Sequence, residues 1–543
     1  MFKSFWKSGD PFIWLTGGAL GFSVIMIIAL IVIVAANALG FFWPGRLVLV
    51  QLQGGGELLG QVVAHEEIPG SHAVGGQPRY RTEFQVANRD LYGADFRWVE
   101  DDQIVSRTFP KDAIFFERWE WGYLFGFLRK VTQHGKVIAE GPVEAWKKFQ
   151  EIHPLMQETL ERIHYIERKE IGAINYSLER LRLETKRTWQ EEHDPARAAE
   201  RVRNLEQQGE VLQQQYQEKA QELKALYGEN ARYSIVVQAA DGREKDLPVA
   251  AVVRAFLPNQ MSWGERLSLY LTRLWEFVWE DPRESNTEGG VFPAIFGTVM
   301  MVLLMSMVVA PFGVVAALYL REYAKQGPLV RAVRIAVNNL AGVPSIVFGV
   351  FGLGFFIYLI GGTIDRLFYP EALPSPTYGT GGILWASLTL ALMTVPVVIV
   401  ATEESLAAIP REWREGSLAL GATKWETIRK IVLPGALPGI LTGMILAMAR
   451  GAGEVAPLMI TGVVKLAPTL PLDTQPPFFH LERKFMHLGF HIYDVGFQSP
   501  NVEAAKPMVF TTTLLLIAII LLLNFTAIYV RNRLRSRLRF STF

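Results

Sequence analysis

The 543-residue sequence contains no cysteine, which excludes disulfide bonds, thiol nucleophiles and thiolate metal sites. It also has no excess of one charge. Its 54 basic and 53 acidic residues give a net charge of +1, which argues against nucleic acid as a partner. A G-x-x-x-x-G-K-[ST] phosphate loop is missing, and so is any Ser-His-Asp or paired-carboxylate arrangement typical of catalysis. We therefore expect a chain that is not an enzyme and that has no catalytic residues, metal or cofactor of its own.

Charged residues make up only 20% of the chain, and most of them lie between residues 44 and 290. The flanks contain apolar stretches longer than the ~18 residues needed to cross a bilayer. The predicted spans cover about residues 12–43, 291–320, 336–360, 383–401, 437–464 and 508–530. The sequence thus predicts a mainly α-helical, polytopic membrane protein with a first transmembrane helix in residues 1–43 and five more in residues 285–543.

Basic residues gather in the segments that share one side of the membrane in a six-span arrangement. The loop after the second span contains Arg321, Lys325, Arg331 and Arg334, and the loop after the fourth contains Arg411, Arg414, Lys424, Arg429 and Lys430. The C-terminal segment adds five arginines between Arg531 and Arg539, and the N-terminus adds Lys3 and Lys7. Because positive residues favour the cytoplasmic side, we expect both termini there and residues 44–290 on the outside.

Residues 44–284 have the pattern of a β-rich domain with a helical insertion. Partial alternation of polar and apolar residues predicts short strands over 46–142 and again over 232–257, where Asp241-Gly242 is a hairpin turn signal. Residues 143–228 instead show apolar residues at helical spacing, interrupted at His193-Asp194-Pro195. We predict a long antiparallel helical hairpin there, which serves as a docking surface for a soluble partner, as a spacer or as a contact with a neighbouring subunit.

The cytoplasmic loop at residues 403–437 contains the strongest motif. Gly421 lies six residues after Glu415, and Ile431 lies ten residues after Gly421. Leu433 and Pro434 follow Ile431. We predict a short helix, a bend at Gly421 and a second helix, because glycine alone adopts most positive φ angles cheaply. Pro434 is expected to stop the second helix and start the next span.

This spacing resembles the coupling loop of ABC-importer permeases, E-A-A-x3-G-x9-I-x-L-P, with Glu415-Gly416-Ser417 in place of Glu-Ala-Ala. The stretches at 311–324, 338–349 and 449–462 are similar to permease subunits of phosphate ABC importers. The resemblance covers roughly residues 285–530 and the first span, but not the large insert. One departure is that Val400 and Ala401, rather than the arginine common in that family, precede Thr402-Glu403.

The resemblance implies an ABC-importer fold and a permease subunit of an ATP-driven phosphate importer in a bacterial inner membrane. It implies that the loop couples to the ATPase through Glu415, Gly421, Ile431, Leu433 and Pro434. The implied partners are an ATP-hydrolysing subunit dimer, which uses the ATP, a second permease chain similar to PstC, and an external phosphate-binding protein. Two alternatives stay open: a permease for another oxyanion such as sulfate or molybdate, and a membrane sensor.

Arg450 and Glu454 form a candidate substrate-pathway pair in the fifth span. Four residues apart, they share one face of a continuous helix, well inside the bilayer. Gly451 and Gly453 beside them are expected to let another helix approach closely. The alternative is an ion pair that joins two permease subunits. His480, His487 and His491, in the loop after this span, match no usual zinc spacing.

Overall fold

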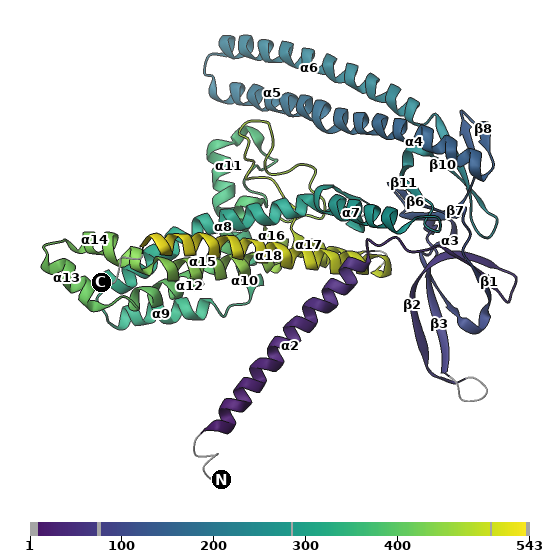
Figure 1. Ribbon diagram of the computed structural model, residues 1–543. Helices are drawn as coiled ribbons and strands as arrows, with labels where there is room; N and C mark the ends of the chain where they lie inside the picture. Colours follow the sequence, from purple (N-terminus) through teal and green to yellow (C-terminus); the bar gives the residue numbers. More distant parts are fainter. Residues whose placement is uncertain (1–8, 73–77, 284–285, 500–501, 539–543) are drawn as a thin grey trace, which may run out of the picture. The chain divides into compact units, whose positions relative to one another are not determined.

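The computed structural model describes residues 9–72, 78–283, 286–499 and 502–538 (Figure 1). The predictions that used Lys3, Lys7, Ser285 and Arg539 lie outside the described residues. The chain divides into two compact units. Met1–Phe41, Val291–Tyr369 and Leu373–Phe543 form the membrane unit, and Phe42–Gly290 with Pro370–Ala372 forms the insert unit.

Among the described residues, six helices of the membrane unit are long and apolar enough to cross a bilayer, which confirms the predicted number of spans. They cover Pro11–Gly40, Phe292–Tyr323, Ser345–Phe368, Ile383–Ala407, Lys424–Gly453 and Val502–Leu534. In Figure 1 they correspond to α2 (Asp10–Gly40), α8 (Phe292–Leu318), α10 (Ser345–Phe351) with α11 (Gly362–Phe368), α12 (Ile383–Ala407), α14 (Lys424–Thr427) with α15 (Leu433–Gly453), and α18 (Val502–Leu538).

Helix α12 forms the centre of the membrane unit and packs against α8 and α15. Glycines let the backbones come close at both interfaces. A Cβ on Gly443 of α15 would lie 2.5 Å from the Ala401 Cβ, and one on Gly313 of α8 would lie 2.6 Å from a Val398 methyl group. Small residues at such crossings let helices pack without a solvent-driven hydrophobic force. The packing therefore makes α12 the most buried of the six helices.

The third span was predicted to begin too early. Residues 328–340 form a separate amphipathic helix, α9 (Pro328–Leu340), and the transmembrane helix starts only at Ser345. Pro344 is the N-cap of this helix, with an extended ψ of 135°. Because a proline disfavours helical backbone at the residue before it, Pro344 separates the two helices.

The fifth span was predicted to be one helix over 437–464, and this was wrong at both ends. The transmembrane helix begins at Lys424 and ends at Gly453. Residues Ala456–Thr461 form a short separate helix, α16. The break has a local cause, because glycines weaken the end of α15 and Pro457 occupies the first turn of α16, where proline is tolerated.

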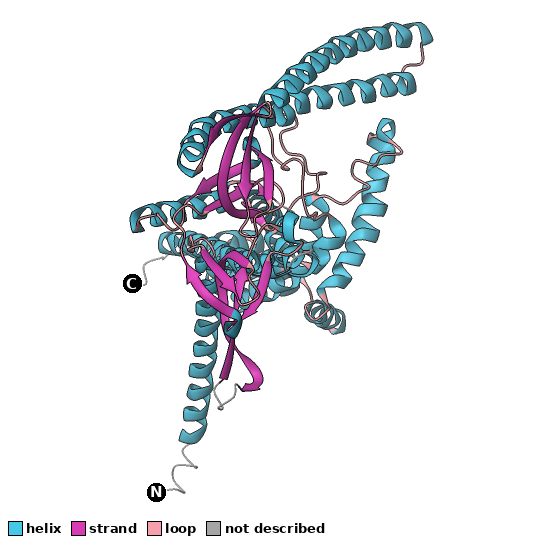
Figure 2. Ribbon diagram, turned by 90° about the vertical axis from the view of Figure 1, so that its right-hand side faces the viewer, coloured by secondary structure: helices cyan, strands magenta, loops and turns pink. Residues whose placement is uncertain are grey.

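The insert unit contains three antiparallel sheets in the described residues (Figure 2). The smallest pairs β12 (Pro282–Arg283) with β13 (Glu288–Gly289). The first has strand order β4-β3-β2-β1-β5, and the second has β10-β9-β7-β6-β11 with β8 paired to β7. The strands are β1 (Val48–Leu52), β2 (Glu57–His72), β3 (Pro78–Gln85), β4 (Phe96–Glu100), β5 (Ile104–Thr108), β6 (Ile114–Arg118), β7 (Tyr123–Gln133), β8 (Lys136–Glu140), β9 (Tyr233–Gln238), β10 (Glu244–Pro248) and β11 (Val252–Phe256). Gly242, at φ +87°, forms the turn between β9 and β10.

The helices of the insert unit include the long hairpin between β8 and β9. It consists of α4 (Pro142–Tyr165), a π-helical turn (Ile166–Ile171), α5 (Gly172–Glu191) and α6 (Pro195–Asn230). Asp194 caps α6, since its Oδ1 accepts a hydrogen bond from the Ala196 N–H at 3.0 Å. Helix α4 covers the second sheet, where Phe149, Ile152 and Met156 join one buried apolar cluster. A further helix, α7 (Trp263–Trp279), follows β11.

Candidate functional site

The loop between α12 and α15 folds into a compact helical hairpin, as predicted. Its first arm is α13 (Arg411–Ala419), its bend contains Gly421 at φ +86°, and its second arm begins with α14 (Lys424–Thr427). Thr423 and Glu426 form a capping box that starts the second arm. Gly421 is the predicted bend residue and has the positive φ that the prediction required.

Two sets of contacts hold this hairpin. Ser417 and Thr427 share a buried hydrogen bond of 2.9 Å between their hydroxyl oxygens, which joins the two arms. At its base, Arg414 donates to the Leu406 and Ile409 carbonyls at 2.7 Å each. Arg414 also pairs with Glu322, at the end of the α8 span, at 3.1 Å. The hairpin is therefore tied to two transmembrane helices rather than hanging from flexible linkers.

The five predicted coupling residues lie on or next to this hairpin. Glu415 is exposed on α13, Gly421 forms the bend, and Ile431 is half-buried in the second arm. Leu433 packs against the apolar cluster of Leu406 and Ile409.

Pro434 does not stop the preceding helix, so that prediction was wrong. The helical segment runs from Lys424 through Pro434 to Gly453. A π-helical stretch, Ile428–Val432, directly precedes the proline. Such wider turns relieve the clash of a proline ring and the loss of its N–H donor. The second arm of the hairpin and the transmembrane helix are consequently one continuous rod.

Four large apolar side chains on the hairpin are exposed, and none of them was predicted as a functional residue from the sequence. The exposed fractions are 49% for Trp413, 49% for Leu418, 90% for Leu420 and 58% for Trp425. A signal was present, because these residues interrupt a strongly charged loop. Exposed apolar patches of this kind mark interaction sites.

The opposite end of the same rod contains Arg450 and Glu454. Arg450 is in the last turn of α15, while Glu454 lies beyond the helix with an extended ψ of 135°. The prediction that both share one face of a continuous helix was therefore wrong, because the helix breaks between them. The Arg450 Nε and Glu454 Oε1 nevertheless lie 3.5 Å apart, with side chains 32% and 22% exposed. The pair is thus partly open to an approaching group.

The two glycines beside this pair behave differently. A Cβ on Gly451 would lie 2.6 Å from the Sδ of Met305, near the middle of α8, so this glycine permits the close approach that was predicted. At Gly453 no described atom lies within 4 Å of such a Cβ. Close helix approach is therefore confirmed at Gly451, and at Gly453 it stays a prediction. The contact with Met305 also places Arg450 level with the middle of the second span.

Buried histidines lie in the segment that follows α16. His487 precedes α17 (Leu488–Tyr493), and both His487 and His491 are almost fully buried. Burial lowers the pKa of each ring to about 4, so both are neutral at pH 7. His480 instead contacts Asp473 and Glu482 at 3.1 and 3.2 Å. Among the described residues, no group of three or more acidic or histidine side chains has a metal-binding arrangement.

The sequence was compared with known protein families and with individual proteins. Residues 309–540 match the family described as binding-protein-dependent transport system inner membrane component. The probable ABC transporter permease protein YqgI of Bacillus subtilis is 30% identical over 223 residues, which are 40% of this chain and 70% of that protein. The phosphate transport system permease protein PstA 2 of Mycobacterium bovis is 32% identical over 255 residues, 46% of this chain and 74% of that protein.

Other matches are shorter. The phosphate transport system permease protein PstA of Mycobacterium leprae is 39% identical over 172 residues, 32% of this chain and 51% of that protein. The chain thus spans about half the length of that relative, and 66% of YqgH of Bacillus subtilis. Among solved structures, the inward-facing MetNI methionine ABC transporter is 19% identical with a TM-score of 0.32, covering 44% of this chain and 94% of that chain.

The matched residues contain the helical hairpin, the Arg450–Glu454 break, four complete spans and the end of the α8 span, whereas the insert unit lies outside the family match. With these features and relatives, the chain belongs to the family of binding-protein-dependent transport system inner membrane components.

Proposed function

We propose that the chain is a permease subunit of an ATP-driven phosphate importer in a bacterial inner membrane and that it forms half of the translocation pathway. The observation that carries this proposal is the continuous helical rod Lys424–Gly453. Its 30 residues span roughly 45 Å at 1.5 Å per residue. The rod has a docking hairpin at one end and the Arg450–Glu454 pair at the other, so a push at the hairpin moves the pair.

The hairpin is the proposed seat of an ATP-hydrolysing subunit dimer. Trp413, Leu418, Leu420 and Trp425 supply apolar anchors of the kind that dominate protein interfaces. ATP binding closes the dimer and displaces the hairpin, and its contacts with Glu322 and Leu406 carry that displacement into α8 and α12. The ATP is used by the partner, and this chain contributes the lever.

Arg450 is the proposed phosphate contact. An arginine offers a planar fork of donors that matches phosphate oxygens, and the pair lies where the fifth transmembrane helix is interrupted. Interrupted helices at mid-membrane depth are a recurring way of building substrate sites in transporters. Glu454 neutralises Arg450 at rest and releases it when the anion arrives. Relatives named as phosphate transport system permeases favour phosphate over other oxyanions.

The complete importer, in this proposal, also contains a second permease chain similar to PstC and an external phosphate-binding protein. Both termini of this chain face the cytoplasm, and residues 44–290 face the periplasm. Protease added outside intact spheroplasts is expected to cut within residues 143–228. Protection of that segment, with cleavage restored by detergent, would overturn the orientation.

The decisive experiment is ATP-driven uptake of labelled phosphate by the assembled complex in proteoliposomes, with the binding protein supplied. Arg450→Gln is compared with Arg366→Gln, a matched change at an exposed arginine of α11. We expect Arg450→Gln to abolish uptake in a complex that still assembles, and Arg366→Gln to leave uptake intact. Unchanged uptake in Arg450→Gln would reduce Arg450 to a structural partner.

The same assay separates the alternatives. Excess sulfate or molybdate that abolishes phosphate uptake, and is itself transported, would identify a permease for another oxyanion. A parent complex that transports none of these anions, and that signals external ligand without needing the ATPase, would identify a membrane sensor. The sensor alternative leaves the apolar hairpin surface without a role.

A further inference from the structure

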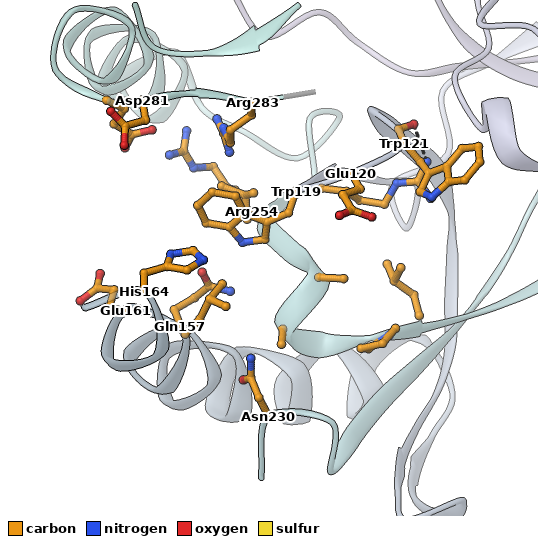
Figure 3. Close-up of a pocket in the computed structure, with 18 of the residues that line it drawn as sticks. Trp119, Glu120, Trp121, Gln157, Glu161, His164, Asn230, Arg254, Asp281 and Arg283 are labelled. Carbon is orange, nitrogen blue, oxygen red and sulfur yellow. Dashed lines mark hydrogen bonds between the residues drawn. The ribbon is translucent and has the colours of Figure 1, made fainter. Parts of the chain in front are cut away.

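The insert unit contains a cavity of about 1010 Å³ (Figure 3). Its wall includes residues of the turn after β6, of helix α4, of the end of α6, of strands β10 and β11, and residues 280–283 after α7. Small-molecule pockets in proteins are of the order of 300–1,000 Å³, so this cavity is large enough for an organic ligand.

One wall of the cavity has buried hydrogen-bond donors without an acceptor among the described residues. The indole Nε1 of Trp119, the Nη1 of Arg254, and the Nε and Nη1 of Arg283 are buried and have no hydrogen-bond partner among the described residues. Buried donors are nearly always paired, because leaving one unpaired is costly. Four such nitrogens on three side chains of one cavity point to a missing acceptor.

Other residues hold the side chains of these donors in place. Arg283 donates through Nη2 to the Oε1 of Glu117 at 3.0 Å, and Arg254 donates through Nη2 to Glu276. The Arg283 guanidinium lies 5.4 Å from the centre of the Trp119 ring, and the ring meets His164 edge-on at 5.5 Å. In Figure 3 both arginines lie on the same side of the cavity, beside Trp119. The side chains are therefore positioned before any ligand arrives.

Charge at this wall favours an anionic group. Arg254, Arg273 and Arg283 all act on the buried Glu117, and together they outweigh its burial and lower its pKa. Each of the two cavity arginines uses one nitrogen on a carboxylate and leaves others free. A carboxylate or phosphate group has the lone pairs to accept from both guanidinium groups and the indole at once.

The rest of the cavity favours hydroxyl groups on the same ligand. Glu120 and Glu161 line it and form no ion pair with a described residue, and Gln157 and Asn230 add amide groups. The buried Asn230 Oδ1 also has no hydrogen-bond partner among the described residues, so it accepts from a donor on the ligand. An inorganic anion alone fills too little of the cavity to reach these groups.

We propose that this cavity binds a small polyhydroxylated organic molecule with one carboxylate or phosphate group, which accepts hydrogen bonds from Trp119, Arg254 and Arg283. The insert unit is then a ligand-binding unit attached to a permease. This binding does not depend on the transported solute, so it can be tested without measuring transport.

The test is isothermal titration calorimetry of the purified full chain with glucose 6-phosphate and glucuronate, with glucose and inorganic phosphate as comparison ligands. We expect at least one of the two organic anions to bind, glucose not to bind, and inorganic phosphate to bind at least tenfold more weakly. Equal binding of inorganic phosphate, or no binding of either organic anion at millimolar concentration, would overturn the proposal.

Conservative variants localise the binding. Trp119→Phe keeps the ring but removes its N–H, and Arg283→Lys keeps the charge beside Glu117 but removes the two free guanidinium nitrogens. Each is expected to weaken binding about tenfold, because a hydrogen bond to a charged group is lost. Arg97→Gln, at an exposed arginine of β4, is the matched control and should bind like the parent. Parent-like affinity in both cavity variants, at unchanged thermal stability, would place the binding elsewhere.

Discussion

Helix α12 of the membrane unit and the insert unit bury polar groups in opposite ways. In α12 the buried hydroxyls of Ser387, Thr389 and Thr394 donate to carbonyls of their own helix, three or four residues back. In the insert unit, the buried Arg118 pairs with Asp90 at 2.9 Å, and Arg283 pairs with Glu117 across 166 residues of sequence. Local hydrogen bonds suit a helix that has lipid around it, whereas paired charges require a folded domain to bring them together.

This difference in hydrogen bonding predicts how well each region tolerates substitution of a buried polar side chain. A hydroxyl bonded within its own helix leaves a satisfied carbonyl behind when it is removed. A buried ion pair that loses one member leaves an uncompensated charge away from water. We therefore expect substitutions at buried polar positions to be mild in α12 and severe in the insert unit.

The largest effect is expected for Asp90→Ala. It leaves the buried Arg118 next to Lys245, a second cation that also contacts Asp90. The insert unit should lose about 3–5 kcal/mol of unfolding free energy. Urea-dependent trypsin cleavage at Arg129 or Lys130, in strand β7 of the second sheet, measures this loss.

Thr389→Val in the membrane unit is the matched comparison. It keeps the side-chain shape and removes one hydrogen bond within α12, so it should cost about 1 kcal/mol. Equal losses of unfolding free energy in Asp90→Ala and Thr389→Val, each measured in its own unit, would contradict the proposed difference between α12 and the insert unit.

Gly421→Val tests the bend of the exposed hairpin, whose shape depends on the positive φ of Gly421. A β-branched residue at φ +86° is strained by about 1–3 kcal/mol, and the bend should move. We expect phosphate uptake to be lost while the complex still assembles in the membrane.

Gly416→Ala is the control for this change, because Gly416 lies within α13 and no described atom is within 4 Å of an added Cβ. It should transport like the parent. Full uptake in Gly421→Val, or loss of uptake in Gly416→Ala, would contradict the lever role of the bend.

A smaller effect is expected from pH, and it concerns a histidine of the membrane unit. His487 is buried by tertiary packing, with its pKa lowered to about 4 from an ordinary value near 6.5. Below pH 6.5 the unfolded chain binds a proton that the folded chain does not, so stability falls as the pH drops from 6.5 towards 4. At pH 5 the loss is about 2 kcal/mol for this residue.

The thermal unfolding temperature of the full chain between pH 7 and pH 5 measures this loss, with His487→Gln as the comparison. The variant should lose less stability on acidification than the parent, whatever its stability at pH 7. The exposed His193, changed in the same way, provides the control. A parallel pH dependence in the parent and His487→Gln would show that His487 does not titrate as described.

Much of the fold follows from local features of the sequence. Apolar length predicts six spans, and the described residues contain six such helices. The hairpin bend at Gly421 and the turn at Gly242 follow from glycine in short polar segments, and both have a positive φ. The helix boundaries were harder, since Pro344 separates two helices and Pro434 lies within one. A proline can end a helix or lie within one, and the conformation of the neighbouring turns decides which of the two occurs.

The sequence by itself determined which segments are apolar enough to cross a membrane, where the hairpin between α12 and α15 bends, and which family the motifs resemble. These properties depend on residues that are close together in the chain. Only the tertiary structure decided that Gly451 packs on Met305 while Gly453 is open, that His487 is buried, and that Trp119, Arg254 and Arg283 share a cavity. Burial and hydrogen-bond pairing depend on segments far apart in sequence, and only the folded chain brings those segments together.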